Sequence, residues 1–209
     1  MQKLFSEGIG HTQFKDTKIG RIPKDWEVRT LNEVCLIIMG QSPSSSAYNE
    51  DEKGLPLVQG NADIKRRVTT PRIHTSQITK ICESGDVIMT VRAPVGAIAK
   101  SNVKCCIGRG VCAFRVKNID SEFLYQCLLG KEKAWVRLEQ GSTFTAVNSK
   151  DIKHFKIPLP TLLEQQKIAD ILSEADAKIE KEEQEKAELE QLKKGLMQQL
   201  LTGQKRVKA

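Results

Sequence analysis

One dense group of basic and polar side chains has the chemistry needed to bind phosphate and to read nucleic-acid bases. Lysine and arginine can hold phosphates, and a guanidinium can grip a guanine edge with two hydrogen bonds. A solvated run of surface charge is the alternative interpretation, and the pattern alone leaves it open. The basic members are Lys65, Arg66, Arg67 and Arg72, set among the polar residues Asn61, Asp63, Thr69 and Thr70.

Further candidate DNA contacts lie in turn-forming and polar segments. Arg92 precedes a rigid turn, Ala93-Pro94-Val95-Gly96, that could present it to a groove, although a structural ion pair would also explain it. Arg109 stands between Gly108 and Gly110, where backbone can come close to a ligand, and a role in the turn alone is the alternative. The remaining candidates are the loop residues Ser142, Thr143, Thr145 and Asn148, which could instead bond within their own loop. Weaker candidates in an earlier polar loop are Gln41, Ser42 and Ser44.

Residues suited to catalysis do not occur in an active-site pattern. Three D-x-K triplets, at Asp51–Lys53, Asp151–Lys153 and Asp176–Lys178, superficially suit a nuclease, but none follows a Pro-Asp on a predicted strand. A methyltransferase would need a glycine-rich cofactor loop and an Asn-Pro-Pro-aromatic or Pro-Cys motif, and neither is present. No Ser, His and Asp are placed as a triad. We therefore expect a protein that is not an enzyme, with no catalytic residues.

The cysteines do not predict a metal site. None forms a C-x-x-C pair, and only His11, His74 and His154 could accompany them. In a cytosolic chain such residues act as small buried hydrophobes. The six are Cys35, Cys82, Cys105, Cys106, Cys112 and Cys127.

Length and charge limit the possible organisation and partners. The 209 residues, 39% of them hydrophobic, fit one globular domain of roughly 150 residues plus a long helix. The net charge of +7 and pI of about 9.1 favour a polyanionic partner, and ordinary solubility charge is the alternative. Nucleic acid is favoured over membrane because no basic amphipathic helix or lipidation signal is present. No stretch approaches about 18 consecutive apolar residues, and the N-terminus lacks the apolar region of a signal peptide. We expect a cytoplasmic protein.

Short strands punctuated by glycine and proline, followed by helices, predict an α+β domain with a curved, mainly antiparallel sheet. Two helices are predicted, Ser121–Leu129 behind an Asp120 cap and Lys131–Gln140. A turn and loop, Gly141–Asn148, should then lead to a final strand at His154–Ile157. The earlier predicted elements are strands at Trp26–Arg29, Cys35–Met39, Leu55–Gln59, Val68–Thr70, Asp86–Val91, Gly96–Ala99 and Val111–Val116, and a short helix around Leu31–Val34.

A long C-terminal coiled-coil helix, predicted from Thr161 to Gly203, should pair with a second helix. Thr161 with Glu164 three residues later predicts a capping box. A helix of roughly 40 residues spans about 60 Å, which exceeds what a small domain can cover with its own core. A charged surface helix is the alternative, and the polar residues from Glu182 to Lys186 interrupt the apolar stripe. The stripe comprises Ile168, Leu172, Ala175, Ile179, Leu189, Leu192, Leu196 and Leu200.

The N-terminus contains an echo of this helix. Met1-Gln2-Lys3-Leu4-Phe5 resembles Met197-Gln198-Gln199-Leu200-Leu201, and a glycine follows each. A similarity over five residues can arise by chance. If it does not, residues 1–18 correspond to the tail of a preceding helix, and a partner copy would supply the other period.

Several ordered segments resemble the specificity subunit of type I restriction-modification enzymes. The most distinctive are IGRIPKDWEVRTLNEV at 19–34 and IPLPTLLEQQKIADILSEADAKI at 157–179. LVQGNADIK, GDVIMTVRAPVGAIA, IGRGVCAFRV and GSTFTAVNSKDI agree with them between residues 57 and 152. Members of this family typically contain two target-recognition domains and two conserved helices that form an antiparallel pair. The present chain resembles half of such a subunit, with one domain and one helix.

The resemblance implies a homodimer that binds double-stranded DNA, with one half-site of a bipartite, palindromic target per chain and a gap set by the helices. It also implies methyltransferase and restriction subunits as partners. S-adenosylmethionine, Mg²⁺ and ATP would be bound by those partners, and no cofactor by this chain. The implied division is an N-terminal segment 1–18, a recognition domain 19–158, a helix for dimerisation and spacing 159–204 and a basic tail 205–209. A coiled-coil adaptor or regulatory protein, whose basic domain binds another partner, is the alternative.

Overall fold

The computed structural model describes residues 2–140 and 147–202 of the chain. The chain divides into two units, Met1–Ala169 and Asp170–Ala209. The first unit is α+β, as predicted, with two sheets, two small strand pairs and short helices. The second unit is helical, continuing a helix that begins in the first. None of the described helices has both the length and the apolar character needed to cross a membrane.

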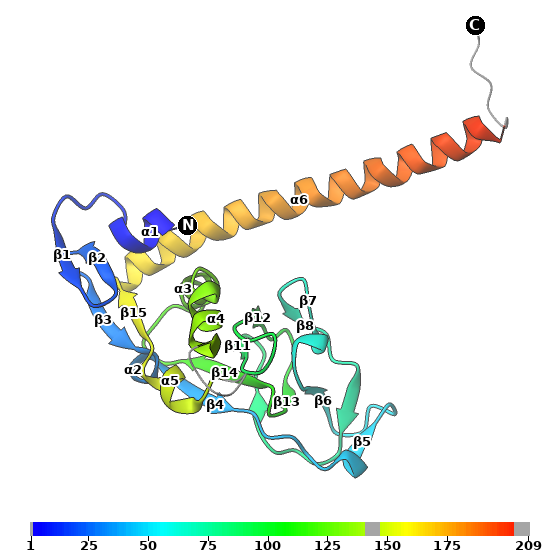
Figure 1. Cartoon of the computed structure of the whole chain (residues 1–209), viewed down its shortest axis with the longest axis horizontal. Helices are drawn as coiled ribbons and strands as arrows, with labels where there is room; N and C mark the ends of the chain where they lie inside the picture. Colours follow the sequence, from blue (N-terminus) through cyan, green and yellow to red (C-terminus); the bar gives the residue numbers. More distant parts are fainter. Residues whose placement is uncertain (1, 141–146, 203–209) are drawn as a thin grey trace, which may run out of the picture. The chain divides into compact units, whose positions relative to one another are not determined.

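A six-stranded sheet forms the frame of the first unit (Figure 1). Its strands pair antiparallel except for β12 and β8, where Lys100 and Val68 pair in parallel. The pairing of β14 with β4 sets Val116 opposite Cys35 and Cys112 opposite Met39. In spatial order the strands are β4 (Cys35–Met39), β14 (Val111–Val116), β11 (Val87–Thr90), β12 (Ile98–Lys100), β8 (Val68–Thr69) and β7 (Ile64–Lys65).

A five-stranded sheet packs against the first. It too is mainly antiparallel, with one parallel pair in which Cys106 of β13 lies opposite Leu57 of β6. Its order is β10 (Ile81–Cys82), β13 (Cys105–Ile107), β6 (Leu55–Val58), β9 (Ile73–Thr75) and β5 (Tyr48–Asn49). Two isolated antiparallel pairs complete the strands: β1 (Phe14–Thr17) with β2 (Gly20–Pro23), and β15 (Lys156–Leu159) with β3 (Glu27–Thr30).

The core lies between the two sheets and is built from alternate residues of their strands. Burial of this apolar surface is the main force that holds the sheets together. The buried cluster draws Ile88, Ala99, Val111 and Ala113 from the first sheet and Val58, Cys82, Cys105 and Ile107 from the second. All six cysteines are buried and none forms a disulfide, which agrees with their predicted role as small hydrophobes.

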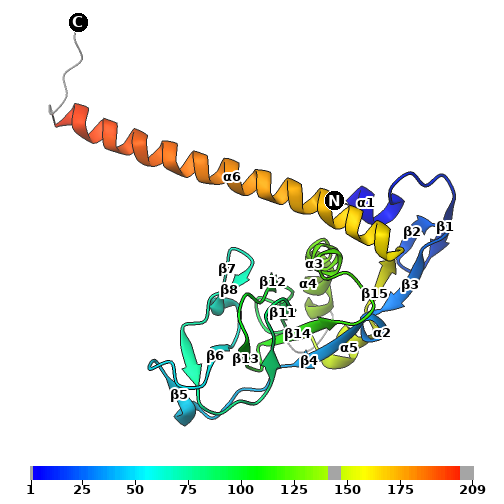
Figure 2. The ribbon, with the colours of Figure 1, turned by 180° about the vertical axis from the view of Figure 1, so that it is seen from behind.

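Helices cover the other face of the six-stranded sheet. All four residues of β11 are buried, because helix α3 (Ser121–Leu129) lies beside β11 and β12 (Figure 2). The predicted cap of α3 is confirmed, since Asp120 Oδ1 accepts the Phe123 N–H at 2.8 Å. The other helical segments are α1 (Gln2–Glu7), α2 (Leu31–Val34), α4 (Glu132–Gln140), α5 (Ser149–His154), α6 (Leu162–Leu201) and the 3₁₀ turns η1 (Ser45–Ala47) and η2 (Asn61–Asp63).

Two local predictions were wrong. His154 ends helix α5 rather than beginning a strand, because Asn148 caps that helix by accepting the N–H groups of Lys150 and Asp151. The capping box of the long helix is only half formed. Thr161 Oγ1 accepts the Glu164 N–H at 3.4 Å, but the Glu164 carboxylate bonds to residues of the N-terminal segment instead of Thr161.

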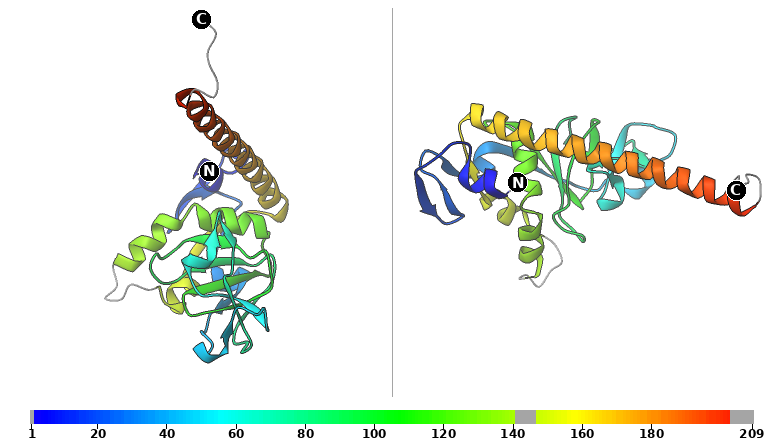
Figure 3. Two further views of the ribbon diagram at one scale, coloured as in Figure 1. Left: turned by 90° about the vertical axis from the view of Figure 1, so that its right-hand side faces the viewer. Right: turned by 90° about the horizontal axis from the view of Figure 1, so that it is seen from above.

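The long helix α6 is continuous over 40 residues (Figure 3). Its predicted apolar stripe divides into two parts. Ile168 and Leu172 are buried, whereas Ala175 and all the later members are exposed. The exposed fractions of Ile179, Leu189, Leu192, Leu196 and Leu200 lie between 41% and 58%.

Candidate nucleic-acid interface

The turn Gly108–Gly110 is the point where several predicted contact residues meet. The Gly108 N–H donates to the Val58 carbonyl at 2.8 Å, which fixes the turn to the end of β6. On its other side the Gln41 N–H donates to the Ile107 carbonyl at 2.9 Å. The Arg109 N–H donates to Ser42 Oγ at 3.2 Å. Gln41 and Ser42, which follow β4, therefore lie beside Arg109.

Gly110 in this turn and the neighbouring Gly40 are required because other backbone segments approach both closely. A Cβ added to Gly110 would overlap the carbonyl oxygen of Gln59, and one added to Gly40 would overlap that of Gly108. Glycine is tolerated at such contacts because it has no side chain. The side chain of Arg109 is exposed and makes no hydrogen bond within the described residues. The turn thus holds the backbone tightly while leaving the guanidinium available to a ligand.

Backbone hydrogen bonds bring two more predicted segments to the same turn. The Val91 N–H donates to the Gly110 carbonyl at 2.9 Å, and the Val147 N–H donates to the Val91 carbonyl at 3.2 Å. Arg92 follows directly and is exposed. Asn148 also lies here, but its side-chain oxygen is occupied in capping α5, and its Nδ2 donates to Asp151 Oδ2 at 2.6 Å. Ser142, Thr143 and Thr145 lie outside the described residues.

The buried side chain of Asp63 connects Arg72 to Gln59, which lies against the turn Gly108–Gly110. Asp63 is 2% exposed, and its carboxylate accepts the Gln59 N–H and Arg72 Nε, each at 2.8 Å. Asn61 is exposed in the same 3₁₀ turn, and the Arg72 side chain is 62% exposed despite its ion pair. We call the resulting connected region the Arg109 surface; it comprises Gln41, Ser42, Asn61, Arg72, Arg92 and Arg109.

The other basic residues that the sequence predicted as DNA contacts form a separate hairpin. Lys65, Arg66 and Arg67 occupy the end of β7 and the two-residue turn before β8, and we call them the basic hairpin. Lys65 and Arg66 are exposed. The Arg67 guanidinium instead pairs with both carboxylate oxygens of Glu132 on α4, with Nη2 to Oε2 at 3.0 Å. The sequence offered no signal for this partner, since Glu132 lies 65 residues away and reads simply as a first-turn helix residue.

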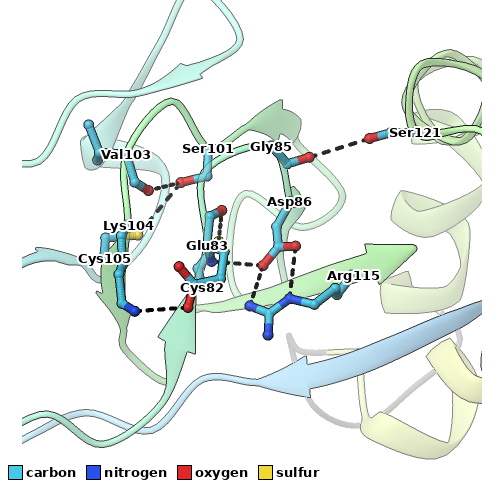
Figure 4. A network of polar contacts seen from close by, with 10 residues as sticks. All are labelled: Cys82, Glu83, Gly85, Asp86, Ser101, Val103, Lys104, Cys105, Arg115 and Ser121. Atoms are coloured by element: carbon cyan, nitrogen blue, oxygen red, sulfur yellow. Dashed lines mark hydrogen bonds and ion pairs between the residues drawn. The ribbon is translucent and has the colours of Figure 1, made fainter. Parts of the chain in front are cut away.

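A second ion-pair network supports the sheet rather than the surface (Figure 4). Asp86 is 6% exposed, accepts Arg115 Nη2 at 2.8 Å and Nε at 3.2 Å, and also accepts the Glu83 N–H at 2.8 Å. The hydrogen bond to Asp86 raises the pKa of Arg115. Because the side chains face one another, this network leaves no charge free for a ligand.

The exposed groups are cations and polar groups that can donate hydrogen bonds, which suits phosphate oxygens and base edges. Within residues 2–140 and 147–202, no group of three or more His, Cys, Asp or Glu side chains could hold a metal ion. Residues 23–191 match the family model of the type I restriction modification DNA specificity domain. The chain belongs to this family.

Individual relatives of this specificity-domain chain agree. It is 41% identical, over its whole length, to a protein of Methanocaldococcus jannaschii named as the specificity subunit of the type I restriction enzyme MjaX, and it covers 50% of that protein. It is 36% identical to the HsdS subunit of Thermoanaerobacter tengcongensis, with a TM-score of 0.73 over 89% of this chain and 47% of that one. A chain from a structure of a type I R-M system is 40% identical, with a TM-score of 0.76 over 84% of this chain and 44% of that chain.

The specificity-domain chain therefore spans about half the length of the curated relatives it matches. The resemblance to the family is confirmed, and so is the α+β fold with a long C-terminal helix.

Proposed function

We propose that this chain is a DNA sequence-recognition subunit of a type I restriction-modification system and that it binds one half-site of a bipartite target. The observation that carries the proposal is the Arg109 surface, where backbone bonds between distant segments leave Arg92 and Arg109 exposed side by side with polar groups. Guanidinium groups on a rigid support suit the reading of base edges as well as contact with phosphates. Family membership supports the same function.

Helix α6 supplies the second half of the proposal, which is a homodimer. The helix holds ten acidic and six basic residues, so its charge disfavours DNA and favours a protein partner. Its exposed leucines recur at helical spacing from Leu189 to Leu200, which suits burial against a second helix. A second copy paired through α6 would carry a second recognition unit. Twofold symmetry would make the target palindromic, and the helices would fix its gap.

In this proposal the chain performs no chemistry of its own. Methyltransferase and restriction subunits bind it in the cytoplasm, and those subunits bind S-adenosylmethionine, Mg²⁺ and ATP. The role as a specificity subunit is supported by two structural neighbours, an HsdS subunit and a chain from a type I R-M system.

The test measures the mass of the purified chain in solution and then its co-purification with a type I methyltransferase subunit. We expect a dimer that captures the subunit. The captured complex should bind duplex DNA less tightly as the salt concentration rises. A monomer that captures nothing and binds no duplex would contradict the proposal. A dimer that ignores both DNA and the methyltransferase would instead favour the coiled-coil adaptor.

A further inference from the structure

The basic hairpin contains two arginines in a backbone conformation that side-chain-bearing residues rarely adopt. Its two-residue turn places Arg66 at φ 47° and Arg67 at φ 63°, between the paired residues Lys65 and Val68. Hairpin turns with positive φ at both positions usually carry Asn-Gly, Asp-Gly or Gly-Gly, because glycine avoids the clash of Cβ with the backbone. The chain uses arginine at both positions, so the turn is strained and must be held by its surroundings.

Arg67 is the residue by which the turn is held. Its carbonyl accepts the Lys100 N–H at 2.9 Å, and its Nη1 donates to the Ile98 carbonyl at 3.2 Å. Its guanidinium also forms the paired contact with Glu132. These bonds hold the backbone carbonyl of Arg67 to β12 and its guanidinium to β12 and α4.

Both contacts of Glu132 are also within the protein. Its Oε1 accepts the Ile98 N–H at 2.9 Å in addition to the Arg67 guanidinium, and its side chain is only 27% exposed. A carboxylate so close to the basic hairpin repels DNA phosphates, so by charge alone it lowers the affinity for DNA. Here it clamps the turn to the strand, and it neutralises Arg67 in doing so.

Arg66 has none of these attachments. It is exposed and makes no side-chain hydrogen bond or ion pair within the described residues, and the same holds for Lys65. The strained residue next to the clamp therefore carries a free guanidinium at the tip of a hairpin whose other arginine is neutralised. A glycine in its place would relax the backbone and lose that charge.

We propose that Arg67 and Glu132 are positioning residues that hold the basic hairpin so that Arg66 contacts a phosphate of duplex DNA. Arg67 itself does not touch DNA in this arrangement, although the sequence predicted it as a contact. The inference rests on the proposed function, because it names how one part of the same recognition unit engages its ligand.

The test is a set of variants whose binding to a duplex containing the target is measured across a salt series. Each phosphate contact makes the slope of log K against log salt steeper by about 0.9. Arg66→Ala should therefore reduce the steepness of the slope by about one per chain and weaken binding about 3- to 10-fold at moderate salt. Arg67→Ala should have the same effect by releasing the turn. The double variant should lower the slope by about one per chain as well, whereas two independent contacts would lower it by about two.

Glu132→Ala separates positioning from plain electrostatics, because the two predict opposite signs. Loss of a negative charge alone would tighten DNA binding, whereas a released hairpin weakens it. Glu83→Ala is the matched control, since it also removes a carboxylate from a surface ion pair, that with Lys104. Tighter or unchanged binding by Glu132→Ala, or a slope change of two in the double variant, would overturn the inference.

Two further measurements keep the test decisive. If Glu132→Ala unfolds, Glu132→Gln takes its place. Trypsin cleavage within residues 65–67 measures directly how firmly the hairpin is held. Faster cleavage of the variant than of the wild type is expected, and equal cleavage would contradict the role of Glu132 in holding the turn. Arg66→Gly should raise the melting temperature while weakening DNA binding, because it relieves the backbone and removes the contact. Wild-type protein that binds no duplex would overturn the proposed function as well, whereas wild-type binding with unaltered variants would overturn only this inference.

Discussion

The indole Nε1 of Trp26 donates a 2.9 Å hydrogen bond to Glu164 Oε2, joining two residues that are 138 positions apart. The other carboxylate oxygen of Glu164 accepts the Ile9 N–H at 3.1 Å and lies 2.9 Å from His11 Nε2. Trp26 is only 1% exposed, and the Glu164 side chain is 14% exposed. One carboxylate in the first turn of α6 thus holds the segment of Ile9 and His11 and the segment of Trp26 together.

Glu164→Ala should lower the free energy of unfolding by about 3 kcal/mol, because Trp26 Nε1 would stay buried without an acceptor. Urea unfolding of the whole chain, followed by the fluorescence of Trp26 and Trp135, measures the change. Glu174→Ala, an exposed position on the same helix, is the control and should change the value by about 0.5 kcal/mol or less. Equal effects of the two substitutions would show that the carboxylate is not an anchor.

Arg109→Ala should weaken duplex binding by about 1–3 kcal/mol if the side chain reads a base, and by less if it meets only phosphate. Arg92→Ala should behave similarly, because Val91 and Gly110 are joined by a backbone hydrogen bond. Fluorescence anisotropy with target and scrambled duplexes distinguishes the two outcomes, since loss of a base contact narrows the difference between them. Lys15→Ala, an exposed lysine on β1, is the control. Unchanged binding by both arginine variants would remove the Arg109 surface from the interface.

Replacing Leu189 and Leu192 together by Asp should convert a dimer to monomers, because charges would occupy the shared apolar seam. Sedimentation velocity at micromolar concentration measures the change. Gln191→Asp is the control, because it adds a charge between the two positions but lies about 160° around the helix from Leu189 and about 100° from Leu192. A dimer that survives the double substitution would place the contact elsewhere.

The buried thiols should resist alkylation until the chain unfolds. Burial raises the pKa of Cys35 and of Cys127 from 9.0 to about 12, so at pH 8 each thiolate is about 1,000-fold scarcer than in the unfolded chain. Intact mass after brief iodoacetamide treatment should show little modification of the native protein and six additions in urea. Rapid labelling of the native protein at these two residues would contradict their burial.

Glu33 should make stability depend on pH in the acid range. Its carboxylate accepts the Thr30 hydroxyl and N–H, each at 2.7 Å, and these bonds lower its pKa from 4.5 to about 2. The stabilisation is complete above pH 4.5 and is lost as pH falls toward 2, because the unfolded chain binds the proton first. Glu33→Gln should therefore be less stable than wild type at pH 6, and the difference should shrink between pH 4.5 and 2. Urea unfolding at several pH values, with exposed Glu50→Gln as control, measures it.

Sequence patterns predicted elements whose signals are local. The Asp120 cap, the short helix after Thr30 and the strand Val111–Val116 all follow from neighbouring residues. Strands β10 and β13 were missed because each has only two or three residues, and their pairing joins segments more than twenty residues apart. The same limit applies to the surface. Exposed arginines could be named from the sequence, but not that Arg67 would be neutralised by a distant glutamate while Arg109 stayed free.

The parallel pairing of β13 with β6, beside the turn that carries Arg109, has a consequence for how the chain folds. Parallel strands require a long crossover, and contacts distant in sequence cost more chain entropy before they become favourable. Helix α6 depends on contacts only four residues apart, which form far sooner. We therefore expect the Arg109 surface to be the last region to mature during folding, and the exposed leucines of α6 to be available for self-association before that surface has formed.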